Sequence, residues 1–500
     1  MKNAEIFEAL NQLERRFPVR AWRSSDIDLW PTYRIRLYLN ALETILRQEP
    51  AQVRSAGPRE ALARVGRAML RVSHAALRDR RANARVDPGT DAVFFSDGVS
   101  FVRVGDTWFD RVVDPVAEAL ERYGHRSLKL TPLDHLHTPR YMPSRFIQPA
   151  IDRIKVTATY RRVPADLPDF EKLQAAARDL LGNMAPSLQW LQVQAARLHG
   201  LAGWFGRVFD RAGATHAFVN TYYSLEGQSF VQAARRRGIR SIDLQHGIQG
   251  PHHVAYAHWA NLPAAGYSTL PDEFWVWSAA EAETIETWRS GCMRHVPRIT
   301  GNFWQERWFD DSDPVVARYL AQARELRDSR PQVLVCGTWG VPDEEITKLI
   351  EAAKLCGSSV RWWWRLHPVL ADQVDAFARR LESHGLDGSQ VRQATDLPLF
   401  ALLRATDINV AHSSTVIGEA AQLGVPSVVT SDYGAELHGE LIQRGLALLA
   451  TDETSIADAI RKLAGRERSP QAGLRDHRGL LRAVLEASFA TPGAAMERQA

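Results

Sequence analysis

The sequence has few cysteines, and their spacing excludes two common classes of cysteine-dependent protein. Cys292, Cys336 and Cys356 are scattered and odd in number, and no CxxC pair occurs. A disulfide framework or a zinc knuckle is therefore not expected, and this composition is typical of a reducing compartment.

Long apolar runs are absent as well. No stretch reaches the roughly 18 apolar residues of a membrane-spanning helix, and the first residues lack the apolar core of a signal peptide. The apolar share of 45% and the charged share of 24% exclude a disordered chain, a collagen and a coiled coil. From the lack of such apolar segments we expect a cytoplasmic protein. Since a single hydrophobic core rarely extends over 500 residues, we also expect two or three domains.

Two nucleotide-binding motifs are also missing. The loop 337–340 (Gly-Thr-Trp-Gly) follows a predicted strand, but no Gly-Lys-Ser/Thr comes after it, so it is not a Walker A loop. No GxGxxG fingerprint occurs either. ATPases and NAD-dependent dehydrogenases therefore lose most of their support, while the loop remains a candidate for contact with a phosphate or a base.

The net charge is only +4, but the basic residues are unevenly distributed. Between residues 54 and 85 there are nine arginines and two acidic residues, and apolar residues recur there at steps of three and four. A helix of this kind can pack on a neighbouring domain, or it can lie on an anionic bilayer surface. Because no aromatic residues are interleaved with the arginines, nucleic acid is not an expected partner.

From residue 91 onward, short apolar segments alternate with amphipathic ones. Strands are predicted at 92–96, 216–220, 241–244, 274–277, 296–300, 333–336, 360–366, 408–411 and 427–430, with a hairpin at 99–108. The alternation restarts near residue 315. We therefore predict an α/β protein with two doubly wound, Rossmann-like domains that face a cleft. The expected parts are a helical, arginine-rich N-terminal extension (1–90), an N-terminal domain (91–315), a C-terminal domain (316–465) and a helical tail (466–500).

In open parallel sheets, ligands bind at the carboxyl ends of the strands, which directs attention to Gln245, His246 and Gly247. An imidazole there can take a proton from an attacking hydroxyl near neutral pH, and the glycine lets the backbone approach a ligand. The alternative is a histidine hydrogen-bonded into the wall between the domains. Glu226, in the first turn of the preceding helix, is a second acid/base candidate or simply a glutamate favoured by the helix dipole.

The segment 246–259 contains three further histidines, His252, His253 and His258. It has no carboxylate or cysteine, and its spacing matches no zinc motif, so no metal is expected. A loop that presents hydrogen-bond donors to an anionic substrate is the favoured interpretation.

Arg365 and His367 lie at the end of a predicted strand in the C-terminal domain, and Pro368 stops that strand. A guanidinium and an imidazole at this position suit a phosphate whose charge grows as a bond breaks. The neighbouring tryptophans, 362–364, are interpreted as core packing on both faces of the sheet.

Three hydroxyl residues, Ser413, Ser414 and Thr415, precede a predicted helix whose free N–H groups favour an anion. Glu419 follows one turn later and can accept hydrogen bonds from a ribose diol. The plainer interpretation is a well-capped helix with a surface glutamate.

Taken together, these motifs resemble the GT-B glycosyltransferase superfamily over residues 91–465. The nearest branch is that of bacterial capsule and surface-polysaccharide enzymes. CDP-glycerol glycerophosphotransferases share the His-Gly and His-Pro elements, and the sialyl- and Kdo-type transferases, which use CMP-sugars, share the His-Pro and Ser-Ser/Thr elements. The stretches 222–247 and 250–259 are similar to uncharacterised capsule-biosynthesis proteins.

The resemblance implies a glycosyltransferase without metal or cofactor, which moves a sugar from a nucleotide-sugar, with a cytidine nucleotide favoured, to a surface-polysaccharide or lipid-linked glycan acceptor. His246 would be the general base, with Glu226 as its alternative. Arg365, His367 and the hydroxyls of 413–415 would hold the donor phosphate, and Glu419 would hold the ribose. The acceptor would bind the N-terminal domain, near Gln245, Gly247, His252 and His253, and the donor would bind the C-terminal one.

The sequence departs from the family pattern in two places. Residues 248–251 (Ile-Gln-Gly-Pro) replace the Thr-Pro-Leu-Lys run of the glycerophosphotransferases. The acidic base motif of many sialyltransferases is matched only in part, by Asp97-Gly98 or by residues 225–227. The identity of the base therefore stays open, as does retention or inversion at the sugar.

Two other functions fit the same motifs. One is a GT-B sugar-nucleotide epimerase, which would need no acceptor, and the other is a non-catalytic capsule-assembly protein that keeps the fold. If the acceptor is lipid-linked, residues 54–85 would supply peripheral contact with the inner face of the cytoplasmic membrane.

Overall fold

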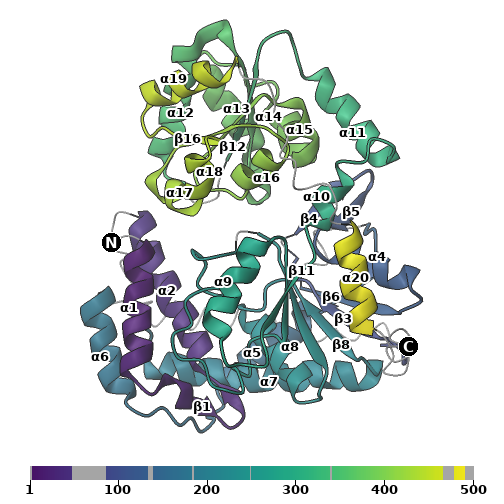
Figure 1. Ribbon diagram of the computed structural model, residues 1–500, viewed down its shortest axis with the longest axis vertical. Coiled ribbons are helices and arrows are strands. Elements are labelled where there is room, and N and C mark those ends of the chain that lie inside the picture. The colour runs from purple at the N-terminus through teal and green to yellow at the C-terminus, as the bar shows by residue number, and fades with distance from the viewer. Residues whose placement is uncertain are drawn as a thin grey trace, which may run out of the picture. The chain divides into compact units, whose positions relative to one another are not determined.

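The computed structural model describes residues 3–47, 86–98, 100–132, 139–182, 185–247, 249–337, 341–465 and 478–489. The chain divides into two compact units, which are coloured along the chain in Figure 1. Unit 1 comprises Met1–Val102, Thr107–Phe303 and Arg478–Ala500, and unit 2 comprises Arg103–Asp106 and Trp304–His477. The predicted basic helix (54–85), loop residues 338–340 and most of the tail lie outside the described residues.

Residues 3–47 are mainly helical, as expected, and they are part of the core of unit 1. Helices α1 (Asn3–Arg16) and α2 (Trp30–Arg47) flank a small hairpin of β1 (Arg23–Ser24) and β2 (Ile27–Asp28). In α1, Ile6, Leu10 and Leu13 recur at helical spacing and are fully buried. The large side chains Trp22 and Trp30 join the same buried cluster as the strands of unit 1.

Unit 1 contains a seven-stranded parallel sheet in the order β11-β10-β9-β8-β3-β6-β7. The strands are β3 (Ala92–Phe95), β6 (Ser127–Thr131), β7 (Ser144–Phe146), β8 (His216–Val219), β9 (Arg240–Leu244), β10 (Glu273–Val276) and β11 (Val296–Ile299). The helices of this unit that follow α2 are α4 (Val113–Arg122), α5 (Gln148–Thr159), α6 (Phe170–Leu181), α7 (Leu188–Ala212), α8 (Leu225–Arg235), α9 (Ala279–Arg289) and α20 (Arg478–Phe489). Strands β3 and β8 are buried along their whole length, which explains why β3 is apolar throughout and β8 is apolar after His216.

The hairpin predicted at 99–108 is present as β4 (Phe101–Val104) and β5 (Thr107–Asp110). Its turn contains Gly105, whose φ of +62° is a conformation that glycine adopts without strain.

Unit 2 contains a five-stranded parallel sheet in the order β13-β12-β14-β15-β16. The strands are β12 (Gln332–Cys336), β13 (Arg361–Arg365), β14 (Ile408–Ala411), β15 (Ser427–Val429) and β16 (Ala447–Leu449). The helical elements are α10 (Phe303–Arg307), α11 (Pro314–Glu325), α12 (Asp343–Cys356), η3 (Gly357–Ser359), η4 (Pro368–Gln373), α13 (Val374–Ser383), α14 (Val391–Asp396), α15 (Leu399–Ala405), α16 (Val416–Gln422), α17 (Asp432–Leu437), α18 (Gly439–Gln443) and α19 (Glu453–Leu463). The two parallel sheets and the N-terminal helices confirm the predicted α/β fold with two Rossmann-like domains.

Helix α20 belongs to unit 1, whereas α19, the helix before it in the sequence, belongs to unit 2 (Figure 1). Leu485 is buried in the same cluster as Phe94 of β3 and Trp275 of β10. The ring of Phe489 stacks on His216 with centroids 3.9 Å apart. The C-terminal helix is therefore part of the core of unit 1.

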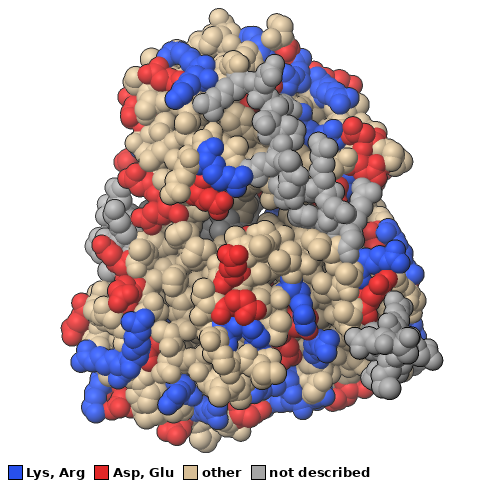
Figure 2. Space-filling model, in the orientation of Figure 1, with Lys and Arg blue, Asp and Glu red and all other residues tan. Residues whose placement is uncertain are grey.

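The surface carries charges of both signs. On the face shown in Figure 2, basic and acidic side chains are interspersed over the described residues. Within the described part of the chain, no helix is both long and apolar enough to cross a membrane.

Candidate functional site

The carboxyl ends of three adjacent strands in unit 1 bring Asp97, Thr221 and His246 to one edge of the sheet. Strands β3, β8 and β9 pair in parallel, so the residues that follow them lie at the same edge. Asp97 is held there by two side chains that follow β8: Asn220 Nδ2 donates to Oδ1 at 3.0 Å, and Thr221 Oγ1 donates to Oδ2 at 2.6 Å. The backbone N–H of Asp97 donates to Asn220 Oδ1 at 3.0 Å. The carboxylate is thus fixed in position and orientation.

His246 follows β9, as predicted, and is partly buried. Its Nε2 lies 3.2 Å from the hydroxyl of Tyr223. Burial lowers the pKa of His246 below its ordinary value, although the charge of Asp97 acts to raise it and that of Arg111 lowers it further. The imidazole is therefore neutral at pH 7 and able to accept a proton.

Gln245 and Gly247 support this strand end. The side chain of Gln245 is buried; its Nε2 donates to the carbonyl of Gly247 at 3.0 Å, and its Oε1 accepts from the N–H of Trp277 at 2.7 Å. Gln245 thus ties the end of β9 to the end of β10. A direct contact of these two residues with an acceptor stays a prediction.

Glu226 lies in the first turn of α8, whose N-cap is Ser224. It forms an ion pair with Lys155 of α5, and its charge also acts on Arg197 of α7. The cationic partners on two helices provide a structural explanation for this glutamate. Of the two acid/base candidates, His246 is the one on which the charge of Asp97 acts, and its role in proton transfer stays a prediction.

The further histidines of segment 246–259 have different surroundings. The ring of His253 lies against Tyr223, with centroids 5.1 Å apart, and burial lowers its pKa to about 3. His258 has a positive φ of 59° and packs on Phe7, while the carbonyl of His252 accepts a hydrogen bond from Asn3. Of the three, His253 is the one that adjoins the tyrosine next to His246. Among the described residues, no group of three or more His, Cys, Asp or Glu side chains is arranged to hold a metal ion.

Unit 2 contains a pocket of about 280 Å³ at the carboxyl ends of four of its strands. The strand ends contribute Cys336 and Gly337 (β12), Arg365 and Leu366 (β13), Ala411 and His412 (β14) and Thr430 (β15). Apolar side chains of α12 and of the η4–α13 segment, including Ile346, Leu349, Leu370 and Phe377, form the walls. Arg380 of α13 pairs with Asp343 of α12, and both residues line the pocket.

Among the polar groups of this pocket that were not predicted as site residues, His412 and Thr430 lie at the strand ends. Thr430 is 2% exposed, and its Oγ1 has no hydrogen-bond partner among the described residues. Burial lowers the pKa of His412, so this imidazole is also neutral at pH 7. Both residues come directly after a strand, which is the signal that could have identified them.

Arg365 is anchored to the end of α14. Its Nη1 donates to the carbonyls of Ala394 and Thr395, at 2.6 and 2.9 Å, and to that of Leu397 at 2.5 Å. A cation at the carboxyl end of a helix is favourable, and it holds α14 to the strand end. This anchoring gives Arg365 a structural role, and its contact with a donor phosphate stays a prediction.

His367 is partly buried just beyond β13. Its carbonyl accepts the N–H of Leu370 at 2.8 Å, which starts the turn of η4. Its role toward a phosphate stays a prediction.

The hydroxyl segment 413–415 begins α16, as predicted. Ser413 Oγ lies 3.1 Å from His412 Nδ1, and Ser414 Oγ accepts the N–H of Val416 at 3.4 Å. The carbonyl of Thr415 accepts the first helical N–H groups. All three residues are partly exposed, and Ser413 contacts His412, which lines the pocket.

Glu419 is buried, at 5% exposure, which corrects the interpretation of a surface glutamate. Burial raises the pKa of Cys336 to about 12, with Arg365 opposing and Glu419 reinforcing the shift. Glu419 and Arg365 therefore both lie near Cys336 at the end of β12. Contact of Glu419 with a ribose stays a prediction.

The two Rossmann-like units, each with polar residues at the carboxyl edge of a parallel sheet, define a fold of the GT-B type. No protein-family model and no curated protein matches the sequence. Among solved structures, the chain is similar to Methanocaldococcus jannaschii UDP-GlcNAc 2-epimerase in complex with UDP-GlcNAc and UDP, with 11% identity, a TM-score of 0.50 and coverage of 80% of this chain and 100% of that chain.

Two further solved structures match over a similar length. UDP-GlcNAc 2-epimerase from Neisseria meningitidis bound to UDP-GlcNAc has 11% identity and a TM-score of 0.48, with 80% of this chain and 100% of that chain covered. The glycosyltransferase SnogD from Streptomyces nogalater has 15% identity and a TM-score of 0.40, with 82% and 100% covered. At such identities the likeness concerns the fold alone.

Proposed function

We propose that this protein is a glycosyltransferase that moves a sugar from a nucleotide-sugar donor, with a cytidine nucleotide favoured, to a glycan or lipid-linked glycan acceptor of a bacterial surface polysaccharide. The reaction would take place on the cytoplasmic side, at the membrane if the acceptor is lipid-linked, and without a resident metal or cofactor.

The observation that carries the proposal is the pocket in unit 2. A site at the carboxyl ends of parallel strands is where an open α/β sheet binds its ligand. Its apolar walls suit a planar base, while the unpartnered hydroxyl of Thr430 and the imidazole of His412 provide hydrogen bonds to a polar ligand.

The second part of the argument is the pair of His246 and Asp97 in unit 1. In the transfer, the acceptor oxygen forms a bond to the anomeric carbon, and the bond from that carbon to the donor phosphate oxygen breaks. The imidazole of His246 takes the proton of the acceptor hydroxyl, and the fixed carboxylate of Asp97 stabilises the imidazolium that forms. Arg365, His367 and the hydroxyls of 413–415 would offset the charge on the departing phosphate.

A thermal-shift screen with CMP, CDP, UDP, GDP and their sugars tests the donor site. The correct nucleotide at 100 times its Kd stabilises the folded state by about 2.7 kcal/mol, and the Tm rises accordingly. We expect this rise in the wild type and in Thr454→Val, an exposed threonine of unit 2 that serves as a matched control. Thr430→Val and His412→Ala should lose most of it.

Calorimetry with the same nucleotide tests the role of His367. We expect His367→Ala to bind about tenfold more weakly, which corresponds to loss of one hydrogen bond to a charged group. Binding as tight as in the wild type would remove His367 from the donor site. If no nucleotide raises the Tm, the glycosyltransferase proposal is wrong.

Product analysis separates the proposed activity from its alternatives. A transferase yields the free nucleotide and a sugar-bearing acceptor, and we expect this turnover to persist in EDTA. An epimerase, the activity of the Methanocaldococcus jannaschii protein of similar fold, yields a sugar epimer with no acceptor. If the protein is instead a non-catalytic assembly protein, cells that carry the His246→Ala or His367→Ala variant would still produce polysaccharide.

A further inference from the structure

The N-terminal helices carry a buried ion pair, and most of its remaining hydrogen bonds leave these helices. Arg34 of α2 and Glu14 of α1 are both 0% exposed in their side chains, and Arg34 Nε lies 2.7 Å from Glu14 Oε1. Trp30 Nε1 also donates to Glu14 Oε1, at 3.0 Å. Burying two charges costs several kcal/mol per ion before their attraction is counted, so such a pair needs further partners.

Those further partners lie in one loop, residues 253–261, which follows His246. Arg34 donates to the carbonyl of Val254, and its Nη2 donates to the carbonyls of Ala257 and His258 at 3.0 and 2.8 Å. The guanidinium also lies over the ring of Trp259, 4.2 Å from its centroid.

Glu14 binds the far end of the same loop. Its Oε2 accepts the N–H of Ala260 at 2.5 Å and that of Asn261 at 3.1 Å, and its backbone carbonyl accepts from the side chain of Asn261 at 2.9 Å. The Arg34 guanidinium thus donates hydrogen bonds to carbonyls of the loop, and the Glu14 carboxylate accepts hydrogen bonds from its N–H groups. The pair satisfies polar backbone atoms that the loop itself leaves unpaired.

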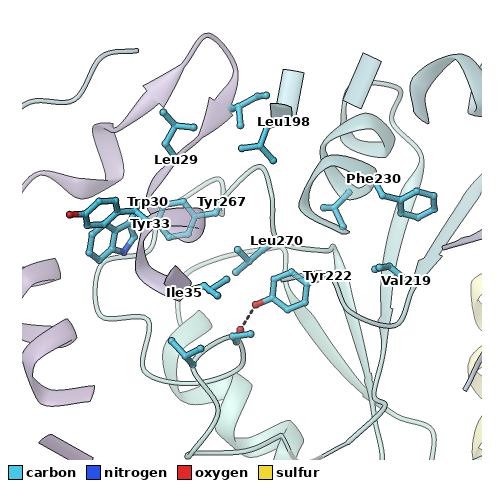
Figure 3. Close-up of a cluster of buried hydrophobic side chains, with 14 of the residues drawn as sticks. Leu29, Trp30, Tyr33, Ile35, Leu198, Val219, Tyr222, Phe230, Tyr267 and Leu270 are labelled. Carbon is cyan, nitrogen blue, oxygen red and sulfur yellow. Dashed lines mark hydrogen bonds between the residues drawn. The ribbon is translucent and has the colours of Figure 1, made fainter. Parts of the chain in front are cut away.

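The held loop in turn contacts the residues beside His246. The hydroxyl of Tyr222 donates to the carbonyl of Ala255, an interaction drawn in Figure 3 next to side chains of the N-terminal segment. The ring of His253 packs on Tyr223, and the ring of Tyr256 lies 6.0 Å from that of Tyr223. Tyr223 is the residue whose hydroxyl lies 3.2 Å from His246 Nε2.

We propose that Glu14 and Arg34 are positioning residues: their ion pair fixes the loop 253–261, and the loop holds Tyr223 and His253 against the imidazole of His246. The role assigned to His246 rests on the proposed function, whereas the fixing of the loop does not. Helices α1 and α2 contribute no strand to the seven-stranded sheet. Their part in the site is to determine the shape of the loop beside its histidine.

Amide hydrogen exchange of the segment 251–262 tests the proposal without any assumption about activity. In Arg34→Met we expect exchange about tenfold faster or more, because one lost hydrogen bond to a charged group corresponds to at least 1.4 kcal/mol of local opening. Arg34→Lys should give a smaller increase, since an ammonium cannot serve three carbonyls and the carboxylate at once. Glu14→Gln should accelerate exchange chiefly at residues 260–261.

The matched control is Lys129→Met, which breaks another buried ion pair of unit 1, that of Lys129 with Asp114. It should lower the Tm while leaving exchange of the loop unchanged. A second measurement is the NMR titration of His246. In Arg34→Met, opening of the loop should move the pKa of His246 toward the ordinary value of a histidine. In Lys129→Met, the pKa of His246 should stay as in the wild type.

In the enzymatic assay, kcat should fall in Arg34→Lys while KM for the donor stays constant. The proposal is overturned if a folded Arg34→Met or Arg34→Lys variant shows loop exchange and His246 titration like the wild type, or if Lys129→Met changes both equally. If Arg34→Met does not fold, the same exchange and titration measurements on Arg34→Lys and Glu14→Gln test the proposal. Should these measurements respond as expected in a protein that transfers no sugar, the glycosyltransferase function is wrong and the fixing of the loop stands.

Discussion

At the scale of single residues, His246 is controlled by two opposing influences. Burial disfavours its charged form, and the nearby carboxylate of Asp97 favours it. Because Asn220 and Thr221 hold that carboxylate by hydrogen bonds, its field on the imidazole is fixed. An imidazole in these surroundings is neutral at rest, and the carboxylate stabilises its protonated form.

Replacing Asp97 by Asn should separate these two influences. The pKa of His246 should fall further, because the charge that raises it is lost, so the acid limb of the pH–rate profile should move to lower pH. At the same time kcat should fall about 10²-fold or more, since the imidazolium loses its counter-charge. The exposed Asp106→Asn variant should keep both the profile and the rate; an unshifted profile in Asp97→Asn would contradict the role of Asp97.

Asp243 allows a prediction about stability. This fully buried carboxyl accepts hydrogen bonds from Tyr256 Oη at 2.9 Å and from the N–H of Tyr222 at 3.2 Å, and burial raises its pKa to about 8. Between pH 3.8 and 8 the folded state thus holds a proton that the unfolded state has lost. This contribution to stability is complete below pH 3.8 and is lost as the pH rises through 8.

Asp243→Asn, which imitates the protonated carboxyl, should remove that dependence. We expect its free energy of unfolding, relative to the wild type, to increase by up to about 1.4 kcal/mol per pH unit from pH 5 to pH 8. Denaturant titrations at four pH values measure the difference. A constant difference would show that Asp243 is ionised in the folded protein.

Single residues were predictable where their position in the sequence determines their position in the fold. His246 and His412 each follow a short apolar strand, and residues that follow parallel strands lie at one edge of the sheet. The pairing of Asp97 with Thr221 was not predictable, because it depends on the register between β3 and β8. The contact of Tyr223 with His253 depends on how a loop folds back, which has no periodic signal in the sequence.

At the scale of elements, the packing of helix α20 in the core of unit 1 can be tested by substitution of Leu485. This side chain is 2% exposed in the core of unit 1, whereas Leu480 of the same helix is 38% exposed. Leu485→Ala should destabilise the protein by about 2–3 kcal/mol, and Leu480→Ala should cost less than about 1 kcal/mol. Urea denaturation measures both; equal effects would mean that α20 is not held in the core of unit 1.

The elements that the sequence did not reveal lack a clear apolar pattern, each for a different reason. Strand β6 has the sequence Ser-Leu-Lys-Leu-Thr, in which a buried lysine that pairs with Asp114 interrupts the apolar pattern. Strand β7 is a short, half-buried edge strand. Helices α13 and α14 are amphipathic but follow the strand-ending Pro368 without an apolar run to separate them. Buried strands such as β3 and β8 were predicted within one or two residues, because burial on both faces requires apolar side chains throughout.

At the scale of the whole molecule, the two sheets were predictable because the alternation of strands and helices occurs in two separate runs. The division of the chain was harder to predict, since unit 1 takes its helices from both ends of the sequence. A solved structure with 11% identity is similar in fold over 80% of the chain, so this fold does not depend on the identity of most residues. The pattern does not encode the sugar or the acceptor, which depend on individual side chains.

Membrane association through the arginine-rich segment 54–85 would also be a property of the whole molecule. We expect deletion of these residues to abolish association with vesicles that contain anionic lipid, because each basic residue near such a surface contributes about 1 kcal/mol. Flotation of wild type and variant with anionic and with neutral vesicles measures this. The thermal shift with nucleotide should be retained; unchanged flotation would contradict the membrane role.

The ion pair of Glu14 and Arg34 has a consequence for biosynthesis. Arg34 reaches its first loop carbonyl across 220 residues of sequence. At ribosomal speeds this separation corresponds to on the order of ten to forty seconds. During that interval the nascent helices have apolar faces and a charge pair whose final partners have not been synthesised. The early helices therefore wait for their late partner during synthesis, and depletion of chaperones should lower the yield of folded protein.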